Sequence, residues 1–247
     1  MKRLKNRVAI VTGCAGGIGQ SFCVGMAKEG AKVVATDLLS TDETVEKVKS
    51  AGGDILALQV DVTSEDSTLK MARQVMNHFG RIDILVNNAG IYPVSPFQDI
   101  RFENWKKVTS VNLDGVFLCT KAVYPHMMAQ NYGRIVNISS VSVFLGSPSL
   151  TPYVTTKAGI IGFTRALASE AGEYGITVNA IAPGLTATKT MLEGSLGAIL
   201  DKTIKMQALK RRLEPDDLLG ALLFLVTDGG DFVTGQTLAV DGGLTRH

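Results

Sequence analysis

A tyrosine and a lysine four positions apart, Tyr153 and Lys157, close the stretch "SVFLGSPSLTPYVTTK" at 142–157. On a helix, residues at this spacing lie on the same face. A phenol has a pKa near 10, too high for a base at neutral pH. An ammonium about 4 Å away, at an effective dielectric near 20, would stabilise the phenolate by roughly 4 kcal/mol, or about 3 pKa units. The pair could therefore move a proton; the alternative is an amphipathic helix face with Tyr153 half-buried and Lys157 solvated.

A glycine-rich stretch, "TGCAGGIG" at 12–19, follows the apolar run 8–12. Glycines there allow a tight turn and the close approach of a pyrophosphate, whose charge the N-terminus of the following helix stabilises. The spacing differs from the common G-x-G-x-x-G, so a purely structural glycine turn is the alternative. The expected dinucleotide contacts are Gly13, Gly17, Ile18 and Gly19.

An aspartate, Asp37, ends the next β-branched run, eighteen residues after Gly19. An acidic side chain there can accept hydrogen bonds from the adenosine ribose hydroxyls. Alone, it would equally be a loop or helix-start aspartate. A 2′-phosphate would bring about two negative charges against it, and neither the glycine loop at 14–15 nor positions 38–39 supplies a basic residue. The sequence therefore predicts NAD rather than NADP as cofactor.

Strand-like and helix-like segments alternate along the chain. Near-continuous apolar runs, typical of strands covered on both faces, occupy 8–12, 32–37, 55–62, 82–88, 134–139, 177–183 and 237–243. Helix-length segments occupy roughly 17–29, 41–50, 64–79, 101–130, 152–174 and 215–227. This alternation predicts an α/β chain, a single-domain Rossmann fold over 1–247 with a doubly wound parallel sheet of about seven strands.

Ligands of open α/β sheets bind at the carboxyl ends of the strands. The third strand leads to Asp61 and Val62, which are expected beside the adenine. The fourth leads into "NNAG" at 87–90, where Asn88, Ala89 and Gly90 are expected beneath the cofactor. The segment 185–213 is longer than an ordinary connection and is predicted to be a substrate lid.

Composition excludes several classes of function. The 247 residues are 45% hydrophobic and 19% charged, and a net charge of +2 gives no electrostatic case for nucleic acid or acidic lipid. Three cysteines without a close pair predict neither a disulfide framework nor a zinc site, and favour a cytoplasmic location. No stretch approaches the roughly 20 apolar residues of a membrane span. The three histidines are scattered, so no metal site is expected.

The order and spacing of several motifs resemble the short-chain dehydrogenase/reductase family over essentially the whole chain. These motifs are Thr12-Gly13-x-x-x-Gly17-x-Gly19, Asn87-Asn88-Ala89-Gly90, Asn112, Ser140, Tyr153-x-x-x-Lys157 and Pro183-Gly184. Three further segments, 87–93, 162–170 and 235–247, are similar to two NAD-dependent groups of that family, the 1-phenylethanol dehydrogenases and the pyridoxal 4-dehydrogenases.

The resemblance implies roles for four residues. Tyr153 would be the general acid/base, and Lys157 would lower its pKa and bind the nicotinamide ribose. Ser140 would hold the substrate oxygen; Ser139 lies one position too far from the tyrosine. Asn112 would fix a water that links Lys157 to solvent. Hydride would pass between C4 of the nicotinamide and the carbinol carbon.

The resemblance also implies contacts around the nicotinamide and the substrate. Expected carboxamide contacts are Pro183, Gly184, Thr186 and Thr188. Expected substrate contacts are Tyr92, Ser140, Ser142, Phe144, Leu185 and Met191. The apolar members would suit a moderately apolar secondary alcohol or ketone. Packing within the lid is the alternative explanation for them.

Three functions compete at this stage. The first is an NAD-dependent dehydrogenase of a secondary, including an aromatic, alcohol. The second is a 3-oxoacyl thioester (acyl-carrier-protein) reductase, which would be expected to use NADPH. The third is a non-catalytic dinucleotide-binding regulator, in which one of the four catalytic residues would typically be lost. A homotetramer is expected, through helices at 112–130 and 152–174 and the C-terminal "LAVDGGLTRH".

Overall fold

Seven parallel strands form the centre of the molecule in the computed structural model, which describes residues 2–194 and 196–246. Their order in the sheet is β3-β2-β1-β4-β5-β6-β7. Their bounds are β1 Val8–Thr12, β2 Lys32–Asp37, β3 Asp54–Gln59, β4 Ile84–Asn87, β5 Gly133–Ile138, β6 Ile176–Pro183 and β7 Thr237–Val240. The predicted Rossmann fold is confirmed.

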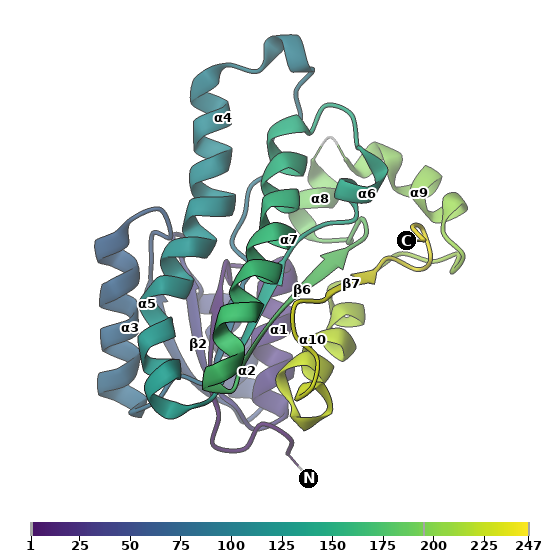
Figure 1. Cartoon of the computed structure of the whole chain (residues 1–247). Helices are drawn as coiled ribbons and strands as arrows, with labels where there is room; N and C mark the ends of the chain where they lie inside the picture. The colour runs from purple at the N-terminus through teal and green to yellow at the C-terminus, as the bar shows by residue number, and fades with distance from the viewer. Residues whose placement is uncertain (1, 195, 247) are drawn as a thin grey trace.

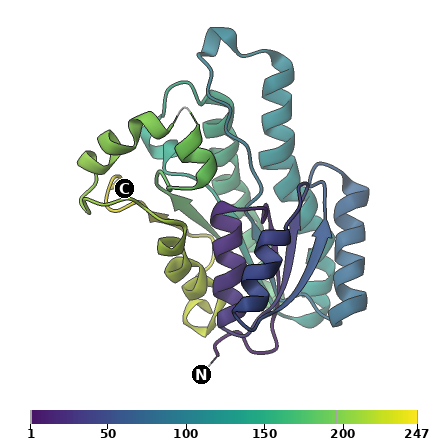
Figure 2. The same ribbon diagram turned by 180° about the vertical axis from the view of Figure 1, so that it is seen from behind.

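Helices cover both faces of the sheet, which Figures 1 and 2 show from opposite sides. On one face lie α1 (Gly17–Lys28), α2 (Asp42–Ser50) and α10 (Leu219–Val226); on the other lie α3 (Glu65–Phe79), α5 (Gly115–Gln130) and α7 (Thr151–Ala171). Successive side chains of β1 enter different cores: Ala9 and Val11 face one, Val8 and Ile10 the other. Burial on both faces explains why β1 lacks polar alternation.

The helix expected at 101–130 is continuous but changes its hydrogen-bonding pattern in one turn. It consists of α4 (Phe102–Thr109), a π-helical turn at Ser110–Asp114, and α5. All three have right-handed helical backbone across the joints, so the chain runs on without a break. α4 projects beyond the carboxyl end of the sheet (Figure 1). The π-helical turn contains the buried Asn112.

The topology provides the ligand crevice. β1 pairs with β2 on one side and with β4 on the other. The strand order therefore reverses at β1, because β2 and β3 are added on one side of it and β4 to β7 on the other. Ligands of such sheets bind at this switch point, beyond the strand carboxyl ends. Two strands end three residues earlier than predicted, β3 at Gln59 and β7 at Val240. Asp61 and Val62 therefore lie in the connection after β3 rather than in the strand.

The segment 185–213, expected to be a lid, folds as a small unit above the sheet (Figure 1). Its bases are tied by a bridge between Thr186 and Leu213, with Ala187 N donating to Leu213 O over 2.8 Å. It contains α8 (Lys189–Glu193), a 3-10 turn at Gly197–Ile199 and α9 (Leu200–Met206). Its member Ser195 lies outside the described residues.

Short elements complete the described chain. They are η1 Phe97–Asp99, α6 Ser142–Leu145, η3 Gly172–Tyr174, η5 Pro215–Leu218 and η6 Asp228–Gly230. All three cysteines are free and buried. None of the helices described is both long enough and apolar enough to cross a membrane.

Candidate active site

The glycine loop after β1 is fastened to the end of β4. Asn88 Nδ2 donates to the carbonyl oxygens of Thr12 and Gly13, each at 2.9 Å. Thr12 Oγ1 accepts hydrogen bonds from the backbone N–H groups of Asn88 and Ala89, each at 3.0 Å. Gly13 has φ 72°, and a Cβ atom there would lie 2.8 Å from Ala89 Cα. Only glycine fits this approach. Asn88 thus supports the loop through both hydrogens of its side-chain amide nitrogen.

The outer part of the loop forms an open cradle at the start of α1. A Cβ at Gly16 would meet no atom within 4 Å, whereas one at Gly19 would lie 2.2 Å from Gly13 O. At Gly17, with φ 57°, it would lie 3.0 Å from Thr188 Cγ2. The loop is therefore packed against protein atoms at Gly13 and Gly19, open at Gly16, and bordered by Thr188 at Gly17. This shape and the adjacent helix N-terminus fit a pyrophosphate.

Asp37 lies at the end of β2 with its carboxylate held by two backbone groups. It accepts hydrogen bonds from Ala15 N at 2.8 Å and Leu39 N at 2.9 Å. Within the described chain, no Lys, Arg or His nitrogen lies within 4.0 Å of this carboxylate. The carboxylate is thus oriented by neutral donors beside the glycine loop, and its charge is not balanced by a cation.

The adenine side of the predicted site follows β3. Asp61 Oδ1 accepts hydrogen bonds from Thr63 N at 2.9 Å and Thr63 Oγ1 at 2.7 Å, which fixes the turn. Val62 lies against the start of α5, where a Cβ at Gly115 would be 2.9 Å from Val62 Cγ2. The aspartate orients the connection, and the valine closes it against the helix.

Tyr153 and Lys157 lie on one face of α7, with Lys157 Nζ 5.6 Å from the centroid of the tyrosine ring. Lys157 is 3% exposed, and its Nζ donates to Ile138 O over 2.6 Å. Ser139 Oγ donates to Lys157 O over 2.8 Å and so ties the helix to the end of β5. Ser139 therefore has a supporting position distinct from that of Ser140.

The expected fall in the tyrosine pKa is wrong for the chain without its ligands. Burial raises the pKa of Tyr153, the side chain of Ser140 opposes this rise as a hydrogen-bond partner, and Tyr92 adds to it. The ammonium donates to Ile138 O, and its nitrogen lies 5.6 Å from the centre of the tyrosine ring. Burial also lowers the pKa of Lys157 to about 8. Desolvation of both groups therefore outweighs their attraction.

Ser140 is buried beside Ser142. Ser142 Oγ donates to Ser140 Oγ over 2.8 Å, and Ser142 N donates to the same oxygen over 3.2 Å. These two donors leave the Ser140 proton available for another acceptor. Ser142, expected to contact substrate, thus supports Ser140 from behind.

Asn112 is completely buried, and its side chain joins three segments. Oδ1 accepts from Ile91 N at 2.8 Å, while Nδ2 donates to Ile91 O at 2.9 Å and Thr156 Oγ1 at 3.2 Å. A Cβ at Gly90 would lie 3.3 Å from Asn112 Oδ1 and 3.5 Å from Lys157 Nζ. The side chain of Asn112 therefore holds the segment after β4 against α7, close to the lysine.

A buried polar network that sequence reasoning missed lies beneath these residues. Asn87 Nδ2 donates to Thr120 Oγ1 at 3.0 Å and to Asn137 Oδ1 at 2.9 Å. Asn137 Nδ2 donates in turn to Thr164 Oγ1 at 3.0 Å. The signal was an asparagine in each of two otherwise apolar strands. Buried side-chain amides need partners, so these residues link β4 and β5 to the helices α5 and α7.

The segment predicted to border the nicotinamide follows the end of β6. Pro183 is the last residue of that strand, and Gly184 N donates to Val240 O over 2.9 Å. Thr186 Oγ1 donates to Gly184 O over 3.1 Å. Thr188 begins α8, where its Oγ1 accepts from Met191 N at 3.2 Å. These bonds direct the segment after β6 toward the glycine loop.

Only some of the expected substrate residues reach Tyr153. The ring of Tyr92 lies edge-on to it, with centroids 6.1 Å apart and an interplanar angle of 69°. Phe144 is partly exposed on α6, two residues beyond Ser142. Met191 is buried with Ala187 and Leu200, and Leu185 and Leu196 pack around that cluster. Met191 therefore stabilises the segment internally, which agrees with the packing alternative.

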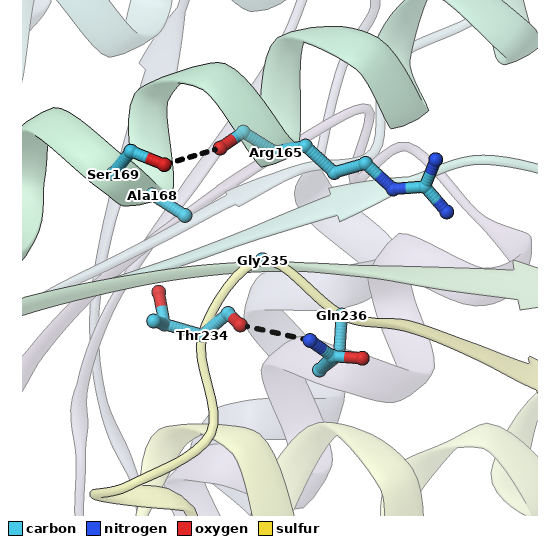
Figure 3. Close-up of a pocket in the computed structure, with 6 residues that line it drawn as sticks. All are labelled: Arg165, Ala168, Ser169, Thr234, Gly235 and Gln236. Atoms are coloured by element: carbon cyan, nitrogen blue, oxygen red, sulfur yellow. Dashed lines mark hydrogen bonds between the residues drawn. The ribbon is translucent and has the colours of Figure 1, made fainter.

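A surface cavity of about 440 Å³ lies elsewhere, between α7 and the connection to β7 (Figure 3). It is lined by Arg165, Ala168, Ser169, Thr234, Gly235 and Gln236. Arg165 is twelve residues beyond Tyr153, which corresponds to about 18 Å along a helix at 1.5 Å per residue. The cavity is separate from the predicted catalytic residues.

Comparison with known proteins identifies the class. The family model described as enoyl-(acyl carrier protein) reductase matches residues 13–245. The chain is 40% identical over 248 residues to a 3-oxoacyl-(acyl-carrier-protein) reductase of Synechocystis, covering 99% of both chains. It is 41% identical over 242 residues to a (2S)-(R)-hydroxy(phenyl)methyl-succinyl-CoA dehydrogenase subunit of Thauera aromatica, covering 97% of both.

A solved structure has the same architecture. It is a proposed 2-deoxy-D-gluconate 3-dehydrogenase from Agrobacterium tumefaciens with bound NADP, 34% identical, with a TM-score of 0.89. The similarity covers 98% of this chain and 97% of that one. The chain therefore belongs to the short-chain dehydrogenase/reductase family. It is an oxidoreductase of a family that binds a nicotinamide dinucleotide.

Proposed function

We propose that this protein interconverts a 3-hydroxyacyl thioester and its 3-oxoacyl form, with NAD(H) as cofactor. The observation that carries the proposal is the meeting of Tyr153, Lys157 and Ser140 beside the glycine loop at the switch point of the sheet. The names of the two relatives from Synechocystis and Thauera aromatica, both concerned with acyl thioesters, favour this substrate class.

The cofactor is held by residues that already have the necessary shape. The open cradle at Gly16 and Gly17 takes the pyrophosphate, Asp37 the adenosine ribose, and the connection at Asp61 and Val62 the adenine. The segment around Ala89 and Gly90 and the contacts Pro183, Gly184, Thr186 and Thr188 border the nicotinamide. When bound, the nicotinamide accepts or supplies the hydride at its C4 atom.

The chain's own residues handle the proton and the substrate oxygen. Tyr153 Oη takes the proton from the alcohol during oxidation and returns it to the carbonyl oxygen during reduction. Ser140 Oγ, held by two donors from Ser142, keeps its proton and donates a hydrogen bond to the substrate oxygen. Lys157 is positioned to stabilise the phenolate form once Tyr153 has lost its proton. Asn112 keeps Lys157 and the segment after β4 in register.

Asp37 supports NAD over NADP. Among the described residues, its carboxylate accepts hydrogen bonds from the backbone N–H groups of Ala15 and Leu39, next to the glycine loop. Two ribose hydroxyls can donate to it, whereas a 2′-phosphate would meet an uncompensated negative charge. The Agrobacterium protein contains NADP, so the fold itself accommodates a 2′-phosphate, and the preference for NAD proposed here depends on Asp37.

A second candidate is oxidation of a secondary aromatic alcohol that has no thioester. The edge-on pair of Tyr92 and Tyr153 favours it, because aromatic rings prefer this arrangement and a substrate ring can extend it. The substrates of the two candidates differ in one group: the 3-oxoacyl thioester has a second carbonyl, that of its thioester, which the aromatic alcohol and its ketone lack.

Spectrophotometric assays of the purified protein distinguish the candidates. We expect reduction of acetoacetyl-CoA with NADH, and oxidation of 3-hydroxybutyryl-CoA with NAD, to have kcat/KM values at least tenfold above those for 1-phenylethanol. A higher value for 1-phenylethanol would select the second candidate. No turnover of any of these compounds with either cofactor would refute both.

We also propose a homotetramer that takes only small molecules as substrates, with the 185–213 segment as lid. β7 is an edge strand, and Phe224, Phe232 and Leu238 are exposed around it. Exposed apolar groups gathered at one edge favour association. Light scattering is the test, and a monomer at micromolar concentration would contradict it.

A further inference from the structure

Tyr92 has a hydroxyl group that the fold leaves unused. Its Oη is buried and has no hydrogen-bond partner among the described residues. Thr188 is close enough to oppose the rise in the pKa of Tyr92 that burial causes. However, no group among the described residues, Thr188 included, meets the distance and angle of a hydrogen bond to Oη.

An unpartnered buried hydroxyl costs free energy that a phenylalanine would avoid at almost the same volume. The group lies in the site and not in the core, since the ring of Tyr92 is 6.1 Å from that of Tyr153. A donor in this position is satisfied if a ligand brings an acceptor to it. Because burial raises the pKa of Tyr92, the phenol keeps its proton at neutral pH and remains a donor.

We propose that Tyr92 Oη donates a hydrogen bond to a second oxygen of the substrate, the acyl carbonyl one methylene away from the reacting carbon. Two phenols on rings 6.1 Å apart can bind two oxygens of one short molecule. The site would then select 3-oxoacyl and 3-hydroxyacyl compounds over simple ketones and alcohols. This inference rests on the proposed function and assigns a selecting residue to it.

The chemistry of the donor indicates a neutral acceptor. Lys157 is the cationic side chain beside Tyr153, and its Nζ already donates a hydrogen bond to Ile138 O. A carboxylate at Tyr92 would therefore be desolvated without a close ion pair, which is costly. An ester or thioester carbonyl has no such cost. A site that hydrogen-bonds a substrate group discriminates strongly against analogues that lack it.

The test compares two substrates of matched length with the NADH-loaded enzyme. Ethyl 3-oxobutanoate contains the second carbonyl without a thioester, and 2-heptanone lacks it. Kinetics are measured for wild type, Tyr92→Phe and the control Tyr124→Phe, in which a tyrosine that packs against Tyr174 loses its hydroxyl. We expect Tyr92→Phe to lower kcat/KM about tenfold for the oxoester and less than twofold for the ketone. The control should change neither.

Four outcomes would overturn the inference. Equal losses on both substrates would mean that Tyr92 acts through Tyr153, and weaker NADH binding in a fluorescence titration would make Tyr92 a cofactor contact. Unchanged oxoester kinetics, or a wild type that reduces neither compound, would also overturn it. If acetoacetyl-CoA is not reduced but the oxoester effect is found, the thioester proposal fails and the role of Tyr92 stands.

Discussion

The carboxyl end of the sheet and the segment 185–213 contribute to the same site in different ways. At the sheet, the side chains of Asn88, Asn112 and Lys157 each donate a hydrogen bond to a backbone carbonyl of another segment. In the segment, a three-residue core of Ala187, Met191 and Leu200 carries two short helices. The residues proposed to transfer the proton are thus held by bonds between different segments, whereas the proposed lid is built around this small apolar core. We call the carboxyl end of the sheet the precise part of the site and the segment 185–213 its adaptable part.

The largest expected effect comes from breaking the precise part. Tyr153→Phe should lower kcat by about 10³-fold, because the variant lacks the proton that general acid catalysis transfers. Its cofactor Kd should stay within twofold of wild type, since one hydroxyl is removed and the ring remains. Steady-state kinetics and fluorescence titration measure the two quantities. Ser140→Ala should lose less, because the acid/base group is still present, and kcat of Tyr153→Phe within a few-fold of wild type would remove the tyrosine from the mechanism.

The second effect concerns cofactor choice. Asp37→Ala should change the ratio of kcat/KM for NAD to that for NADP by about a hundredfold in favour of NADP, because a unit charge about 4 Å from the phosphate is lost. Both ratios are obtained from initial rates at fixed substrate. Asp61→Ala is the matched control, since it removes a carboxylate on the adenine side and should leave the ratio nearly unchanged. Equal use of both cofactors by wild type would contradict the role given to Asp37.

A third prediction uses the pH dependence of stability. Lys157 has a folded pKa of about 8, below its ordinary value of 10.5, because burial disfavours its charge. The folded state therefore binds fewer protons than the unfolded state between these values, so this penalty is complete below pH 8 and disappears as pH rises toward 10.5. From pH 7 to 10, wild type should gain about 2 kcal/mol in unfolding free energy relative to Lys157→Met.

Urea denaturation of both proteins at several pH values measures this gain. Their difference cancels the titration of groups that they share, such as Cys119, whose pKa burial raises to about 12. A flat difference between pH 7 and 10 would show that the lysine keeps its ordinary pKa in the folded chain.

The smallest effects are expected in the adaptable part. Met191→Ala should raise KM several-fold with little change in kcat, because the cavity loosens the 185–213 segment while leaving the catalytic residues in place. Leu192→Ala, at an exposed neighbouring position, should change neither constant by more than twofold. Hydrogen exchange should be faster at 189–206 in the first variant only. A large fall in kcat for Met191→Ala would mean that the two parts are not separable.

Sequence reasoning succeeded where one local rule acts. Period and run length located the strands and helices within a few residues, and the glycine spacing located the loop that follows β1. It failed where two effects compete, as in the pKa of Tyr153, whose direction depends on burial and on where Lys157 Nζ points. The partner of Ser142 and the inward position of Met191 depend on tertiary contacts that no local pattern contains. Catalytic roles and the lid stay predictions.

At the π-helical turn Ser110–Asp114, the number of residues in the turn affects the direction of Asn112. A π turn contains one more residue than the α-helical turn it replaces, so α4 and α5 differ in angular phase by about 100°, the rotation of one helical residue. Asn112 owes its inward direction to that extra residue. Substitutions on the surface of this helix leave the phase intact, whereas deletion of a single residue would rotate all of α4 about the axis and turn the asparagine away from Ile91. We therefore expect this turn to tolerate substitutions better than deletions or insertions.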